Sequence, residues 1–191
     1  MNQQKAQQTV DEIFALYEEY GADDYIGEPV SQLEHMCQAA QLAQSDGHDD
    51  EVVLAAFFHD IGHLCEHIMT VGQMDGYGVA DHEMLAGNFL RQKGFSGKIA
   101  RLVESHVQAK RYLTYKKPAY CNKLSEASKI TLEKQGGIMT DAESELFEQD
   151  HLYLLFIKLR EWDDKAKLQH QPLPSLDKFK KMAFYHLMRQ N

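Results

Sequence analysis

The segment Val52–His63, with the sequence VVLAAFFHDIGH, constrains the fold more than any other stretch of the chain. Its apolar run from Val52 to Phe58 is too continuous for an amphipathic surface helix, so we predict a fully buried helix with His59 and Asp60 near its end. A carboxylate buried there needs a partner, and a metal ion can satisfy Asp60 and an imidazole at the same depth. Alternatively, His59 caps helix carbonyls and Asp60 caps the next turn. The dipeptide alone leaves both readings open.

Length, composition and charge exclude several classes of protein. A chain of 191 residues, 43% of them hydrophobic, predicts a single domain over residues 1–191 with a sizeable core. It holds neither an apolar span of membrane length nor a basic-then-apolar leader, so we expect no membrane association and a cytoplasmic location. The net charge of -9 disfavours nucleic acid as a partner, and an anionic substrate would need a locally basic pocket. The odd cysteine count without CxxC spacing predicts reduced thiols.

Helical periodicity runs through the chain and no strand pattern competes with it, so we predict an all-α fold. Gly21 is a plausible stop for the first helix, and Ser31 opens the second. Ser96 and Ser175 are expected to cap two later helices. The stretch Met69–Gly78 is rich in glycine and lacks periodicity, which predicts a loop.

Four histidines fall where four successive helices would each turn one imidazole inward, and two aspartates add carboxylates. Individually, each histidine is more often an ordinary core or surface residue, but together they indicate a metal site. The candidate ligands are His35, His59, Asp60, His82, His106 and Asp163. Five other histidines stand in polar or terminal contexts and are expected at the surface, namely His48, His67, His151, His170 and His186.

The order of these ligands, H, then HD, then H, H and a late D, resembles the HD-domain superfamily. A fuller likeness is to its mixed-valent di-iron oxygenases, and in particular to the glycine-forming 2-amino-1-hydroxyethylphosphonate dioxygenases. The segments that carry it span most of the chain and read DYIGEPVSQLEH, VVLAAFFHDIGH, GYGVADHE, ESHVQAKRYL, LSEASKITLEKQGG and REWDDKAK. The resemblance implies an all-helical HD-domain bundle that holds two irons.

Residue by residue, the resemblance implies a mixed-valent Fe(II)/Fe(III) pair. It assigns His35, His59 and Asp163 to one iron, His82 and His106 to the other, and Asp60 to both as a bridge. With fewer protein ligands, the second iron would keep more open positions for substrate and dioxygen. Ligand spacing alone does not name the metal, because the same residue types hold Mn, Mg or Zn in HD phosphohydrolases.

The resemblance also implies a pocket for a phosphonate group. The residues that match are His63, Lys110, Ser128 and Arg160, with Gln135 as a further lining residue. A dianionic headgroup in an acidic protein requires such cations, with arginine for paired oxygen contacts and lysine as a point charge. The plain alternative is that Lys110 and Arg160 complement helix dipoles and stay solvated.

Tyr25 and Glu28 lie in the loop before the first ligand helix. In the oxygenases that the chain resembles, the tyrosine phenolate can occupy an open iron position at rest and the glutamate contacts the entering substrate. Otherwise, a loop tyrosine is usually a packing lid and a loop glutamate a solvated carboxylate. The resemblance thus implies a catalytic role for both.

The implied activity is an oxygen-dependent cleavage of the carbon–phosphorus bond in a small 1-hydroxyphosphonate, converting 2-amino-1-hydroxyethylphosphonate to glycine and phosphate. The sequence leaves open the trimethylammonium analogue, which would give glycine betaine and phosphate. It also leaves open a metal-dependent HD phosphohydrolase, which would use a metal-activated water. A non-catalytic HD module is disfavoured by the intact ligand set.

Overall fold

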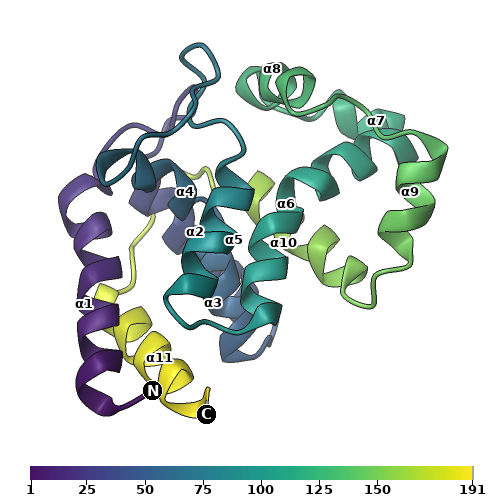
Figure 1. Ribbon diagram of the computed structural model, residues 1–191. Coiled ribbons are helices and arrows are strands. Elements are labelled where there is room, and N and C mark those ends of the chain that lie inside the picture. Colours follow the sequence, from purple (N-terminus) through teal and green to yellow (C-terminus); the bar gives the residue numbers. More distant parts are fainter. Residues whose placement is uncertain (191) are drawn as a thin grey trace.

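The computed structural model describes residues 1–190, and this part of the chain is helical with connecting loops (Figure 1). Its only β-pairings are two isolated bridges, Asp24 with Ser31 and Gln73 with Val79, which confirms the all-α prediction. The longer helices are α1 (Gln3–Tyr20), α2 (Gln32–Ser45), α3 (Asp50–Phe58), α5 (His82–Gln92), α6 (Gly97–Lys116), α8 (Glu126–Lys134), α9 (Asp141–Glu148), α10 (Tyr153–Lys165) and α11 (Leu176–Arg189). Short turns form α4 (Ile61–Leu64), the 3-10 helix η1 (Cys65–His67) and α7 (Pro118–Cys121). Within residues 1–190, none of the helices has the length and hydropathy needed to cross a membrane.

The helix ends follow the local signals in the sequence. Gly21 ends α1, and Ser31 caps α2 in a capping box with Glu34. Ser96 accepts a hydrogen bond from the Ile99 N–H, and Ser175 caps α11 in the same manner. These caps satisfy backbone N–H groups that a helix start leaves without partners, so short polar residues at these points set the boundaries.

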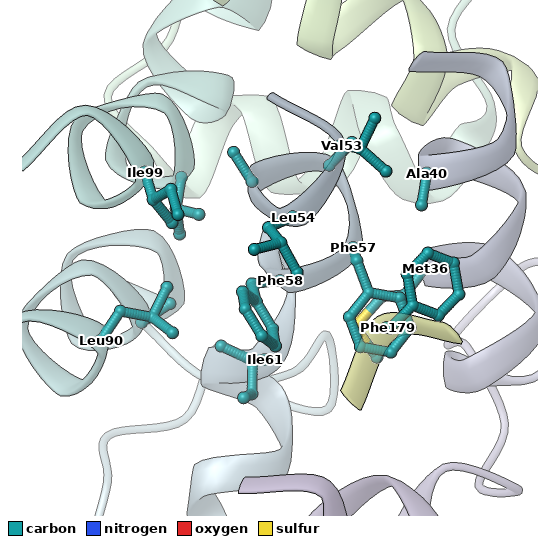
Figure 2. Close-up of a cluster of buried hydrophobic side chains, with 14 of the residues drawn as sticks. Met36, Ala40, Val53, Leu54, Phe57, Phe58, Ile61, Leu90, Ile99 and Phe179 are labelled. Atoms are coloured by element: carbon teal, nitrogen blue, oxygen red, sulfur yellow. The ribbon is translucent and has the colours of Figure 1, made fainter. Parts of the chain in front are cut away.

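In helix α3 the segment Val52–Phe58 is buried on every side, as its continuous apolar run predicts (Figure 2). Phe57 stacks on Phe179 of α11 at 4.2 Å between ring centroids, and Phe58 meets Phe95 edge-on at 5.2 Å. Each side chain of this size contributes about 1.5–3 kcal/mol when it leaves water. The packing fixes the C-terminal end of α3, and with it the residues that follow.

His59 and Asp60 lie just past α3 rather than within it. His59 occupies the C-cap position, and Asp60 stands in the turn before α4. Gly62 on α4 lies so close to α5 that a Cβ atom there would overlap the carbonyl oxygen of His82. The glycine therefore lets the start of α5 approach the HD turn directly.

His186 contradicts the expectation of a surface residue, because its exposed fraction is only 7%. The Ser96 N–H donates to its Nε2 atom at 3.1 Å, and its ring stacks on Phe95 at 5.5 Å. His186 thus joins α11 to the start of α6, a tertiary contact that the polar end of the chain does not indicate.

Three segments meet at one end of the molecule, where Figure 1 shows α8 near the loop that follows η1. Lys134 of α8 donates to Asp75 of that loop at 2.6 Å. Gly27, in the loop before α2, has a φ of 78°, and a Cβ there would lie 2.7 Å from the Ala127 side chain of α8. The same three segments supply Ile26, Met74 and Ala127 to the lining of the cavity described below.

Candidate metal centre and adjoining pocket

The six candidate ligands converge from helices that are far apart in the sequence. His35 comes from α2, His59 and Asp60 from the turn after α3, His82 from the start of α5, His106 from α6 and Asp163 from α10. All six are buried. They form two clusters that share Asp60.

In the first cluster, the Nε2 atoms of His35 and His59 face each other at 3.0 Å. The Asp60 Oδ2 atom lies 3.4 Å from the first of these nitrogens and 3.3 Å from the second. Asp163 adds its Oδ1 atom at 3.4 Å from the His35 nitrogen. Two imidazoles and two carboxylate oxygens thus surround one point.

In the second cluster, the Nε2 atoms of His82 and His106 also face each other at 3.0 Å. The other oxygen of Asp60, Oδ1, lies 3.4 Å from each of these nitrogens. The Asp60 carboxylate therefore turns one oxygen to each pair of imidazoles, which is the arrangement of a bridging carboxylate.

Hydrogen bonds at the far sides of the rings identify which nitrogens carry protons. The Nδ1 atoms of three rings lie against backbone carbonyl oxygens: His35 on Ala166 at 2.9 Å, His59 on Ala56 at 2.8 Å and His106 on Val103 at 2.8 Å. A carbonyl only accepts, so each Nδ1 carries the hydrogen and each neutral ring turns a lone pair into its cluster.

This arrangement suits metal ions. Facing lone pairs at 3.0 Å repel, and Asp60 Oδ2 and Asp163 Oδ1 are buried without a hydrogen-bond donor. A cation between them satisfies every one of these atoms. Nitrogens at right angles around an ion ~2.1 Å away are separated by roughly 3 Å, as these are.

The electrostatics of the first cluster also favour a bound cation. Burial lowers the pKa of His35, but the carboxylates of Asp163 and Asp60 outweigh it and raise that pKa to about 9. Burial raises the pKa of Asp60, yet the imidazoles around it, His59 foremost, hold that pKa well below its usual range. The cluster thus favours positive charge, which either a proton or a metal ion supplies. Asp60 makes no helix-capping hydrogen bond, so the capping alternative does not describe it.

His63 stands beside the second cluster, and its nitrogen comes within 4.8 Å of ligand atoms of Asp60 and His82. The Val79 N–H donates to His63 Nδ1 at 3.2 Å, so the hydrogen of the neutral ring is on Nε2. Burial, and then the charge of His82, lower the pKa of His63 to about 3, which keeps the ring neutral. His63 is therefore a hydrogen-bond donor rather than a lone-pair donor to a metal.

A cavity of about 60 Å³ is bordered by Asp60, His82 and His106. It is lined by every residue predicted around the substrate, namely Tyr25, Glu28, His63, Lys110, Ser128, Gln135 and Arg160. It is also lined by Gln32, Tyr77 and Thr131, which the sequence reasoning missed. Thr131 follows Ser128 by three residues on α8, a spacing that places both on one helix face and could have identified it.

Lys110 is only 3% exposed, which contradicts the alternative of a solvated dipole partner. Its ammonium donates to Thr131 Oγ1 at 2.9 Å and to Gln135 Oε1 at 2.5 Å. Burial, followed by the nearby charge of Arg160, lowers the pKa of Lys110 to about 7. Near neutral pH this amine can therefore hold or release a proton at the cavity wall.

Arg160 is buried as well, and it touches both the first cluster and the cavity. Its guanidinium donates to Asp163 Oδ2 at 2.6 Å, to Asp164 Oδ1 at 2.5 Å and to the Tyr120 hydroxyl at 3.0 Å. These bonds turn the free oxygen of Asp163 toward His35 and hold the guanidinium plane in one orientation.

Tyr25 and Glu28 close the cavity from the loop before α2. The Tyr25 ring stacks on His35 with 4.1 Å between ring centroids. Burial and the charges of Asp60 and Asp163 raise the pKa of Tyr25 well above its usual value. Glu28 accepts a hydrogen bond from Lys167 at 2.6 Å, so it is paired rather than solvated.

The chain is similar in sequence to a known family and to several known proteins. The model of the HD domain matches residues 32–186. The uncharacterized protein L432 of Acanthamoeba polyphaga mimivirus is 42% identical over 186 residues, covering 97% of this chain and 85% of the relative. The [1-hydroxy-2-(trimethylamino)ethyl]phosphonate dioxygenase (glycine-betaine-forming) of Leisingera caerulea is 36% identical over 174 residues, covering 91% of this chain and 88% of the relative. The hydroxymethylphosphonate dioxygenase of Gimesia maris is 38% identical over 174 residues, with coverages of 89% and 84%.

Proposed function

The chain belongs to the HD-domain family, and we propose that it is a di-iron dioxygenase that cleaves the carbon–phosphorus bond of a small 1-hydroxyphosphonate. The observation that carries the proposal is the Asp60 carboxylate, whose two oxygens each face a pair of imidazoles 3.0 Å apart beside a cavity that Lys110 and Arg160 help to line. Two relatives named as phosphonate dioxygenases, each covering more than four fifths of both chains, support the reaction class.

The two clusters would hold the irons. The first ion would take His35, His59, Asp163 and Asp60 Oδ2, and the second His82, His106 and Asp60 Oδ1. Imidazole and carboxylate suit iron, and a mixed-valent Fe(II)/Fe(III) pair would supply the redox chemistry with dioxygen. The protein then has to bind, orient and neutralise the substrate.

The cavity walls are suited to an anionic headgroup. Lys110 and Arg160 supply positive charge in an acidic protein, and the His63 Nε2–H and the Ser128 hydroxyl supply neutral donors. Because Lys110 and Arg160 are buried and already oriented by neighbouring side chains, little entropy is lost when they bind the phosphonate oxygens. Gln135 acts by holding the Lys110 ammonium.

Tyr25 and Glu28 would control entry to the open metal positions that face the cavity. Tyr25 lies over His35 and lines the same cavity, and Glu28 stands next to it in the loop. The charge of a bound ion would have to outweigh the burial and the carboxylates that raise the pKa of Tyr25 before its phenolate could bind.

For the substrate itself we propose 2-amino-1-hydroxyethylphosphonate, converted to glycine and phosphate. Glu28 is the acidic side chain that lines the cavity outside the two clusters, and a carboxylate there favours a substrate with an ammonium group. The trimethylated substrate of the Leisingera relative and the hydroxymethylphosphonate of the Gimesia relative are the competing candidates.

The test compares the three phosphonates on protein loaded with iron under anaerobic conditions. Admitting dioxygen should release phosphate, with glycine from the aminated compound and about one dioxygen consumed per turnover. Asp60→Ala should lose both ions, because both clusters share that carboxylate. A hydrolase takes oxygen from water and needs only a Lewis acid. Phosphate release by zinc-loaded protein without dioxygen would therefore overturn the proposal in favour of a metal-dependent phosphohydrolase.

A further inference from the structure

His82 differs from the other three clustered histidines at the nitrogen that faces away from the cluster. His35, His59 and His106 each place Nδ1 on a backbone carbonyl. The Nδ1 atom of His82 is buried and finds no hydrogen-bond partner within residues 1–190. The acceptor beside it is Glu83 Oε2, at 3.6 Å.

Glu83 is itself an unsatisfied buried group. Its exposed fraction is 6%, and no donor in the described part of the chain reaches its Oε2 atom. It lies in the first turn of α5, where the exposed N–H groups and the helix dipole favour a carboxylate. A buried donor position and a buried acceptor therefore stand next to each other, slightly beyond hydrogen-bond length.

The neighbouring His63 ring does not supply the missing partner of His82. The ring of His63 stacks on it at 4.1 Å, but His63 Nδ1 already accepts from the Val79 N–H. The backbone of His82 is fixed by the close approach of Gly62. A small change in side-chain torsion can thus close the gap to Glu83 without moving the helix.

We infer that Glu83 is a positioning residue of the second metal site, whose carboxylate accepts the Nδ1–H of His82 when Nε2 of that ring binds the ion. This inference rests on the metal centre of the proposed function. A carboxylate behind an imidazole makes the ring a more basic ligand than a neutral carbonyl does. The first cluster, with both rings on carbonyls, has no such support.

The assignment explains an imbalance between the two clusters. The first offers two imidazoles and two carboxylates, whereas the second offers two imidazoles and its share of Asp60. Fewer ligands mean weaker binding unless each ligand is stronger. Glu83 strengthens one of them without occupying a coordination position, so the second ion stays open toward the cavity.

The test measures metal binding and thermal stability rather than turnover. Glu83→Gln keeps an acceptor oxygen without the charge, and Glu83→Ala removes both. Titrating the metal-free proteins with Fe(II) under anaerobic conditions should weaken the second ion by roughly tenfold in the Gln variant and up to about a hundredfold in the Ala variant. The first ion should bind as in the unmutated protein.

The metal-free Glu83→Gln protein should melt at the same or a higher temperature, because a buried carboxylate whose Oε2 atom lacks a donor is replaced by an amide. Glu104→Gln is the matched control, since Glu104 pairs with Arg91 across α5 and α6 and does not touch His82. It should lower the melting temperature and leave both metal affinities unchanged. Opposite effects on stability and affinity distinguish positioning from ordinary packing.

Unaltered binding of both ions by both Glu83 variants would overturn the inference and leave the metal centre standing. Equal weakening of both ions with a lower melting temperature would overturn it too, because it would show a structural role only. If the unmutated protein bound no second ion, the proposed function itself would fail, and the inference with it.

Discussion

Replacing Lys110 by methionine is expected to stabilise the metal-free protein while it weakens phosphonate binding. The lysine is 3% exposed, and burial lowers its pKa from 10.5 to about 7. At 1.36 kcal/mol per pH unit, that difference corresponds to a cost of about 5 kcal/mol when the buried amine is charged. Methionine removes this cost, but it also leaves Thr131 and Gln135 without their donor, and that loss destabilises the folded protein by about 2 kcal/mol. The net gain at neutral pH is about 3 kcal/mol.

The sign of the pH dependence follows from the lowered pKa. Between pH 7 and 10.5 the unfolded chain holds a proton on Lys110 that the folded protein releases, so the stability of the unmutated protein rises with pH in this window. The variant lacks this proton. Its advantage should therefore be largest near pH 6.5 and small by about pH 9.5.

Urea denaturation of the metal-free proteins at these two pH values provides the assay. Lys116→Met is the matched control, because Lys116 lies on the same helix, is 39% exposed at its side chain and pairs with Glu148 at the surface. The control should change stability little at either pH. Two results would refute the reasoning. One is a Lys110→Met protein that is less stable than the unmutated protein near pH 6.5. The other is a difference in the free energy of unfolding between the two proteins that is the same at both pH values.

Two further predictions concern residues that support the site. Gly62→Ala places a Cβ atom against the backbone carbonyl of His82 in α5 and should destabilise the fold by about 3 kcal/mol. Gly97→Ala meets nothing within 4 Å and should stabilise it by about 0.5 kcal/mol, and thermal melting that ranked the two alike would contradict this. Lys167 donates a hydrogen bond to Glu28 at 2.6 Å, so Lys167→Met leaves the Glu28 carboxylate free to pair with a substrate ammonium group. The variant should raise the kcat/KM of an aminated phosphonate relative to that of hydroxymethylphosphonate by about tenfold. A ratio that stays unchanged in steady-state kinetics would remove Lys167 from substrate selection.

Local patterns in the sequence predict the helices and the inward histidines because their causes are local. Ser31 and Ser96 cap helices through bonds that span three residues, and α3 is buried because its own residues are apolar. His106 faces inward because Ile99 and Val103 share its helix face. Each of these signals lies within one or two helical turns.

The remaining features depend on contacts between distant segments, which no local pattern encodes. Glu28 was expected as a loop carboxylate, yet its partner Lys167 lies beyond α10. His186 stands in a polar sequence context and is buried by its packing on Phe95.

The two clusters also differ in the length of chain between their first and last ligands. The first joins His35 near the start of the chain to Asp163 near its end, whereas the second lies between Asp60 and His106. An ion in the first cluster would act as a cross-link across most of the chain. Because that loop is more than twice as long, closing it restricts the unfolded chain by at least ~0.6 kcal/mol more. Loading of the first ion would thus tether α10 to α2, while the second would constrain only the middle of the chain.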